Sequence, residues 1–146
     1  MSLLDDDTLK DIALAQNVII NEDVSVVVVN YGKIWRKKKG GGIRPFLEVI
    51  EEMGKDIHGS VIGDRILGRA SALLCLYSKA RAVYTPQATK AAIALLIMGS
   101  IPAKVDQLIP FIKNRNNSGL CPFEKMLENI NEPKEAYNVL KEKVLK

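Results

Sequence analysis

The sequence of 146 residues has the length of one domain, and 47% of its residues are hydrophobic while 26% are charged. These fractions are typical of a globular protein and exclude a disordered chain. The 21 basic against 17 acidic side chains give a net charge of +4, which permits an anionic ligand. Aromatic residues make up only 5%. The interleaved basic and aromatic pattern of nucleic-acid-binding proteins is therefore missing, and we do not expect a nucleic-acid partner.

The cysteines and the N-terminal residues bear on the compartment. Cys75 and Cys121 lie far apart, and residues 5–7 are acidic where a secretory signal would be basic. The longest apolar stretch, residues 91–98, is too short to cross a bilayer. We therefore expect a cytoplasmic protein with reduced thiols and no membrane partner.

Hydrophobic periodicity and turn residues predict alternating helices and strands. In chain order we expect a helix over 6–16, a strand over 24–29, its hairpin partner over 33–37, a helix over 44–53, a strand over 60–63, a turn over 64–68 and a helix to 79, a strand over 82–85, a helix over 86–98, a strand over 101–108, and helices that open at 122 and 133. Residues 91–98 are apolar all round, so we expect that helix to be buried. The order predicts one α/β domain over residues 1–146, with a mixed five-stranded sheet covered on both faces.

Three glycines, Gly40, Gly41 and Gly42, directly precede the second predicted helix. Glycine lets a backbone approach a ligand closely, and the free N–H groups of a first helical turn suit an anion. Arg44 adds a guanidinium that can bind phosphate or carboxylate through two donors. No Gly-Lys-Ser/Thr closes the loop, so it is not a P-loop. The alternative is a flexible hairpin exit flanked by solvated lysines.

Asp64 stands where the third predicted strand gives way to a helix. Ligands of α/β proteins gather beyond such strand ends, so Asp64 could act as a general base or accept a hydrogen bond from a ligand, with Arg69 one turn later. Aspartate is also among the best N-cap residues. Both interpretations stay open at this point.

The segment Cys121-Pro122-Phe123-Glu124 is the most specific local feature. With Pro122 at the first helical position, Cys121 falls at the N-cap, where the positive helix end favours a nucleophilic thiolate. Glu124 falls where a capping box would return its carboxylate to the N-cap backbone. Asn114 and Arg115 lie just upstream and could face the same cleft. The alternative is a small buried cysteine beside a capped helix. Cys75 lies in an apolar helix and is expected in the core.

One histidine, His58, and the two cysteines match the ligand types of a zinc deaminase, but not their spacing. That chemistry needs H-x-E at one helix start and P-C-x-x-C at the next. His58 is followed by Gly59 and Ser60, and the cysteines lie on different helices. We therefore expect no metal and no other cofactor.

The predicted element order resembles that of the cytidine deaminase-like superfamily, a three-layer α/β/α sandwich. More narrowly, the chain is similar to a small uncharacterised family of that superfamily that has lost the zinc ligands. The motifs that carry the resemblance are Gly42-Ile43-Arg44-Pro45, Gly63-Asp64, Gly68-Arg69-Ala70, Asn114-Arg115 and the run from Gly119 to Glu124. The resemblance implies a pocket where a deaminase holds its zinc and base. It does not imply deamination, because every metal-binding position is replaced.

Three functions follow as hypotheses. In the first, a pocket binds a small anionic ligand such as a nucleotide, a nucleobase derivative or a phosphorylated metabolite; the ligand-binding residues would be Gly41, Gly42, Arg44, Arg69, Asn114 and Arg115. In the second, the protein is an enzyme with Cys121 as nucleophile and Asp64 or Glu124 as acid or base. In the third, it is an interaction module that assembles, for example as a homo-oligomer. The sequence does not decide whether there is catalysis.

Overall fold

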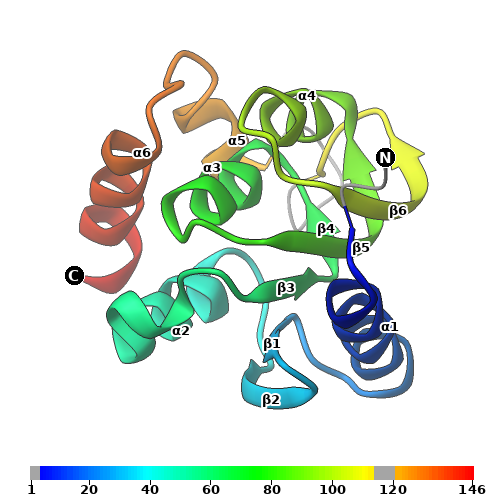
Figure 1. Cartoon of the computed structure of the whole chain (residues 1–146). Helices are drawn as coiled ribbons and strands as arrows, with labels where there is room; N and C mark the ends of the chain where they lie inside the picture. The colour runs from blue at the N-terminus through cyan, green and yellow to red at the C-terminus, as the bar shows by residue number, and fades with distance from the viewer. Residues whose placement is uncertain (1–3, 114–120) are drawn as a thin grey trace.

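The computed structural model describes residues 4–113 and 121–146, and these form one mixed sheet with helices on both sides (Figure 1). The strands are β1 (Val26–Asn30), β2 (Lys33–Lys38), β3 (Val61–Asp64), β4 (Ile66–Leu67), β5 (Ala82–Thr89) and β6 (Ala103–Ile109). The helices are α1 (Asp6–Asn21), α2 (Arg44–Met53), α3 (Arg69–Tyr77), α4 (Lys90–Met98), α5 (Pro122–Met126) and α6 (Pro133–Leu140), with the short turns η1 (Gly54–Ile57) and η2 (Lys141–Leu145). The element order is the predicted one, except that β4 lies where the sequence predicts a turn.

The two faces of the sheet carry separate cores, which makes the architecture a three-layer α/β/α sandwich. Along β1, Val27 and Val29 pack with α1, whereas Val26 and Val28 pack on the face covered by α2, α3, α4 and α6. Alternate residues of a strand point to opposite faces, so a fully apolar strand requires cover on both. The predicted fold class is confirmed.

The sheet contains six strands rather than five, because two short strands, β3 and β4, share the place beside β5 where one strand is predicted. β3 pairs in parallel with the first half of β5 and β4 with its second half, so the two short strands lie end to end. A bend at Arg65 separates them. The guanidinium of Arg65 donates hydrogen bonds to the carbonyls of Ile19, Glu22 and Val24 at the end of α1.

The prediction that a helix opens at Pro86 is wrong, because β5 continues to Thr89. Proline lacks the N–H that a central strand normally donates. The pairing of β5 with β3 ends at Tyr84 and its pairing with β4 begins at Gln87, so Pro86 falls in the interval between them. Helix α4 begins only after Thr89, whose side chain accepts a hydrogen bond from Ala92 N–H.

Other differences concern the ends and exposure of helices. α1 continues beyond residue 16 to Asn21, and α5 opens at Pro122 as predicted and ends at Met126. α4 is not buried all round: Ile97 and Met98 are 69% and 82% exposed.

None of the helices in the described residues is long and apolar enough to cross a membrane.

Candidate functional site

The N-terminus of α3, where the sequence predicts a ligand site, is occupied by a side chain of the protein itself. The Glu124 carboxylate accepts hydrogen bonds from the backbone N–H groups of Arg69 at 2.8 Å and Ala70 at 2.9 Å. A carboxylate is favoured there because the first N–H groups of a helix lack backbone acceptors and lie at its positive end. Glu124 therefore caps α3 and not its own helix, which corrects the capping-box prediction. The N-cap position of α3 is Gly68, so Asp64 is not the cap either.

The side chain of Arg69 binds the residues that follow Glu124 in the chain. Its guanidinium donates to the carbonyl oxygens of Leu127 and Ile130, both at 2.6 Å, and to the side-chain oxygen of Asn131. A guanidinium has five N–H donors, and here three of its contacts are made within the chain. Arg69 and Glu124 together tie the segment 124–131 to the start of α3; we call this arrangement the Glu124 clasp.

Gly68 makes the clasp sterically possible. A Cβ atom added at Gly68 would stand 2.3 Å from Ile112 Cδ1 and 2.4 Å from Glu124 Oε1. Both distances are far below van der Waals contact, so the carboxylate can reach the helix end only because residue 68 has no side chain. The space in front of α3 is thus filled by the chain.

The glycine loop before α2 lies on the same side of the molecule as the clasp. Gly40 and Gly42 have φ of 126° and 68°, which favour glycine, and Phe123 Cε2 is 3.6 Å from where a Cβ of Gly42 would lie. Gly41 is exposed. Helix α2 begins at Arg44 as predicted, but the Arg44 guanidinium donates to the Val144 carbonyl near the C-terminus.

Asp64 is buried at the end of β3, with 8% of its surface exposed. Burial raises the pKa of the Asp64 carboxyl from 3.8 to about 7, although hydrogen bonds from the Ser71 side chain and from the backbone N–H groups of Arg65 and Ile66 oppose the rise. Its Oδ2 atom has no hydrogen-bond partner among the described residues. Cys75 is buried near it, and burial together with the Asp64 charge raises the pKa of that thiol well above its ordinary value.

Cys121 is the N-cap of α5 and Pro122 follows at the first helical position, as the sequence predicts. The thiol is partly exposed, and its side chain makes no capping hydrogen bond. Asn114 and Arg115, expected to face the same cleft, lie outside the described residues. The nucleophilic role of Cys121 stays a prediction. Within residues 4–113 and 121–146, no three His, Cys, Asp or Glu side chains are placed to hold one metal ion.

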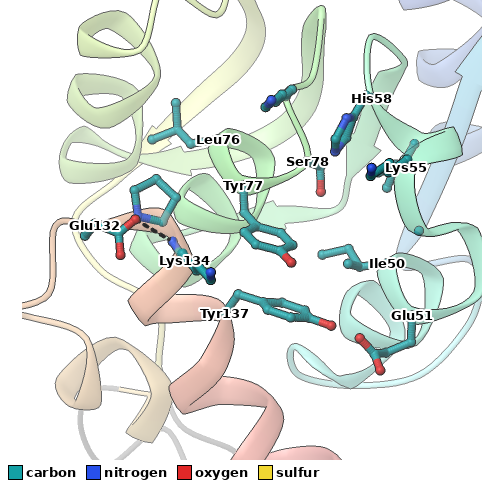
Figure 2. Close-up of a pocket in the computed structure, with 14 residues that line it drawn as sticks. Ile50, Glu51, Lys55, His58, Leu76, Tyr77, Ser78, Glu132, Lys134 and Tyr137 are labelled. Atoms are coloured by element: carbon teal, nitrogen blue, oxygen red, sulfur yellow. Dashed lines mark hydrogen bonds between the residues drawn. The ribbon is translucent and has the colours of Figure 1, made fainter.

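An open pocket lies at the opposite ends of α2 and α3 (Figure 2). It has a volume of about 560 Å³ and is bounded by the last turns of α2 and α3, by η1 and by the start of α6. We call it the α2–α3–α6 pocket. Its basic lining residues are Lys55, His58, Lys79 and Lys134.

The two carboxylates of this pocket are already engaged. Glu51 forms an ion pair with Lys141 at 2.9 Å. Glu132 caps α6 by accepting from the backbone N–H groups of Lys134 at 3.0 Å and Glu135 at 2.8 Å. The lysines of the lining have no ion pair among the described residues, so the free charge at the pocket is positive.

Two tyrosines form one wall of the pocket. The rings of Tyr77 in α3 and Tyr137 in α6 stack with centroids 4.2 Å apart and an angle of 10° between planes. Figure 2 shows both hydroxyls directed toward the side of Ile50 and Glu51. The buried hydroxyl of Ser78 also lines the pocket and has no hydrogen-bond partner in the described chain.

No sequence pattern predicts this pocket, because its residues belong to no motif. Lys55 and His58 follow α2, Lys79 follows α3, and Lys134 opens α6, so only the packing of α6 against α2 and α3 brings them together. The one local signal is His58, the single histidine of the sequence. It is exposed, and it belongs to this cluster of basic side chains.

The chain is similar to several solved structures, and a similarity with a high TM-score supports the fold. A DUF1893 family protein (TM1506) from Thermotoga maritima superposes with a TM-score of 0.83 over 96% of this chain and 92% of that one, at 22% identity. RibD from Acinetobacter baumannii gives a TM-score of 0.47 at 14% identity, over 67% of this chain and 33% of that one. A diaminohydroxyphosphoribosylaminopyrimidine deaminase/5-amino-6-(5-phosphoribosylamino)uracil reductase from Thermotoga maritima gives 0.46 at 17% identity, over 83% and 40%.

No curated protein matches the chain. A family model matches residues 14–144, which is nearly the whole sequence and includes both the clasp and the α2–α3–α6 pocket. The chain therefore belongs to the TM1506 family, described as a domain of unknown function (DUF1893).

Proposed function

We propose that the protein binds a small anionic ligand in the α2–α3–α6 pocket. The observation that carries the proposal is the set of basic groups around an open volume of about 560 Å³: Lys55, Lys79 and Lys134, which form no ion pair with any described residue, and His58 beside them. Pockets for metabolites commonly measure about 300–1,000 Å³ and place a few polar groups on an apolar wall. Glu51 is paired with Lys141, and the Glu132 carboxylate is held by backbone N–H groups of α6, so the three lysines outnumber the one carboxylate without an ion pair in the described residues.

The start of α3 is less suited to the same task. An incoming phosphate or carboxylate would have to displace Glu124 from two backbone N–H groups, and Arg69 offers its donors to three acceptors of the chain. At the α2–α3–α6 pocket a ligand would meet lysines that have no ion pair in the described residues. We therefore keep the anionic ligand predicted from the sequence but place it at the other ends of α2 and α3.

The pocket is proposed to bind a ligand and not to catalyse a reaction. The residues expected to act in catalysis, Cys121, Asp64 and Glu124, are not among its lining residues. The tyrosine wall offers two hydroxyls and apolar ring surface, which suits an anion with a small organic body. Ser78 supplies a further hydroxyl that a bound ligand or water could satisfy.

The test is the melting temperature measured with inorganic phosphate, pyrophosphate, a nucleoside monophosphate and citrate. A ligand at a hundred times its Kd stabilises a protein by about 2.7 kcal/mol, which for this chain length raises the midpoint by about 5 to 10 °C. Lys134→Glu should abolish the rise. The matched control Lys10→Glu reverses an exposed charge on α1, on the other face of the sheet, and should retain it. Equal shifts in both variants, or a flat panel, would overturn the proposal.

A further inference from the structure

The open edge of the sheet and the helix beside it share an apolar surface. β6 pairs with β5 on one side and with no other strand of the described chain, and α4 packs next to it (Figure 1). Ile97 and Met98 on α4, Leu108 in β6 and Phe111 just beyond it are all more than 40% exposed. We call these residues with β6 the β6–α4 edge.

Helix α4 differs from the other long helices in having no polar outer face. Its only charged residue is Lys90 at the first position, and its exposed residues after that are Ala91, Ala94, Ile97 and Met98. By contrast, α2 exposes Glu51 and Glu52. A helix that is apolar all round is normally buried, so the outer face of α4 lacks a cover in the described chain.

β6 has charged residues, Lys104 and Asp106, that can keep unlike strands away, but it lacks the other features that protect an edge strand. No proline or bulge interrupts Ala103–Ile109, and five of its seven residues are exposed. Such a strand presents free N–H and C=O groups to a further strand. The occupant of the edge should therefore be a strand with an apolar helix beside it.

The charges of β6 identify that strand as a second β6. In an antiparallel pair with a two-fold axis at Val105, Lys104 of one copy lies opposite Asp106 of the other, and the same pair recurs by symmetry. Directly opposite unlike charges stabilise a strand pair, whereas like charges destabilise it. We infer that the β6–α4 edge is a homodimer interface, in which two copies pair their β6 strands antiparallel about Val105 and cover each other's α4.

The first test is the molar mass in solution, measured by sedimentation over a wide concentration range. The wild-type chain should sediment as a dimer that dissociates on dilution. Met98→Lys should weaken the dimer by about tenfold or more, because it buries an unpaired charge. Ile20→Lys is the matched control, since Ile20 is 58% exposed on α1, and it should leave the dimer unchanged. A monomer at every concentration, or equal effects of the two variants, would overturn the inference.

The second test addresses the register. Lys104→Asp places carboxylates opposite each other and should weaken the dimer, again by about tenfold or more. Among the described residues, Lys104 Nζ donates a hydrogen bond to Gln16 Oε1, at 2.6 Å. Gln16→Ala removes that contact without changing the charge, so it should leave the dimer intact. If Lys104→Asp leaves the dimer intact, the two-fold axis at Val105 is wrong. If Met98→Lys also leaves the dimer intact, the inferred interface is wrong. This inference is independent of the proposed ligand.

Discussion

The two ends of α2 and α3 differ in what occupies them. At the N-terminal ends, the Glu124 carboxylate, the Arg69 guanidinium and Phe123 fill the space in front of the helices. At the C-terminal ends, basic side chains surround an open pocket whose two carboxylates are engaged, Glu51 by Lys141 and Glu132 by backbone N–H groups of α6. The N-terminal ends of these helices are therefore filled by the chain, whereas their C-terminal ends border the pocket where we propose that a ligand binds. We call the N-terminal ends of α2 and α3 the closed end and their C-terminal ends the open end. Substitutions at the closed end should change the free energy of unfolding, and substitutions at the open end should change ligand binding.

The largest effect at the closed end should come from Asp64 and should depend on pH. Its folded pKa of about 7 lies above the ordinary value of 3.8, so between these values the folded state holds a proton that the unfolded state has released. Stability from this group is therefore fully present below pH 4 and is lost as pH rises to 7, by about 4 kcal/mol in total.

Asp64→Asn tests this assignment, because the amide cannot ionise. Its unfolding free energy relative to wild type should rise steadily between pH 4 and pH 8, measured by urea denaturation at each pH. Asp56→Asn, at an exposed position in η1, is the control and should show no such trend. A pH-independent difference for Asp64→Asn would mean that Asp64 is ionised in the folded protein throughout.

The clasp should give the next largest effect. Glu124→Gln keeps the shape of the side chain but removes its charge and one of its two acceptors, so a backbone N–H at the start of α3 loses its partner. We expect a loss of about 1–2 kcal/mol in unfolding free energy, measured by urea denaturation. Glu128→Gln, exposed just beyond α5, should change stability by less than about 0.5 kcal/mol. Equal values for the two variants would show that the clasp does not stabilise the fold.

The contrast between the two ends also explains what the sequence could predict. Local sequence patterns predict that α2 begins at Arg44 and ends at Gly54, and that Cys121 is the N-cap before Pro122. Each of these features depends on residues within one turn. The partner of Glu124 was not predicted. The same Glu124 carboxylate can form a capping box in its own helix or cap a different helix. Only the tertiary structure brings it to the backbone N–H of Arg69, 55 positions away in the sequence.

The Pro86 error has a related cause. Proline in the first turn of a helix is a sound local signal. Here, however, Pro86 lies between the part of β5 that pairs with β3 and the part that pairs with β4, so neither strand needs an N–H donor at this position. The α2–α3–α6 pocket likewise depends on where α6 packs, which no local pattern encodes. Local signals thus gave element types and caps, while the pairing of distant segments determined the site.

The smallest effect on stability should occur at the open end. Lys55 and Lys134 are exposed and make no ion pair in the described chain, so replacing either with Glu should change the unfolding free energy by less than about 0.5 kcal/mol. Lys134→Glu can even be slightly stabilising, because it places a carboxylate in the first turn of α6. The measurement is urea denaturation without added anion, in parallel with the ligand-induced shift in melting temperature. A variant that keeps full stability but no longer responds to an anion would separate the binding end from the closed end. A loss of stability as large as that of Glu124→Gln would instead make both ends structural, since the lysines would then be holding α6 in place.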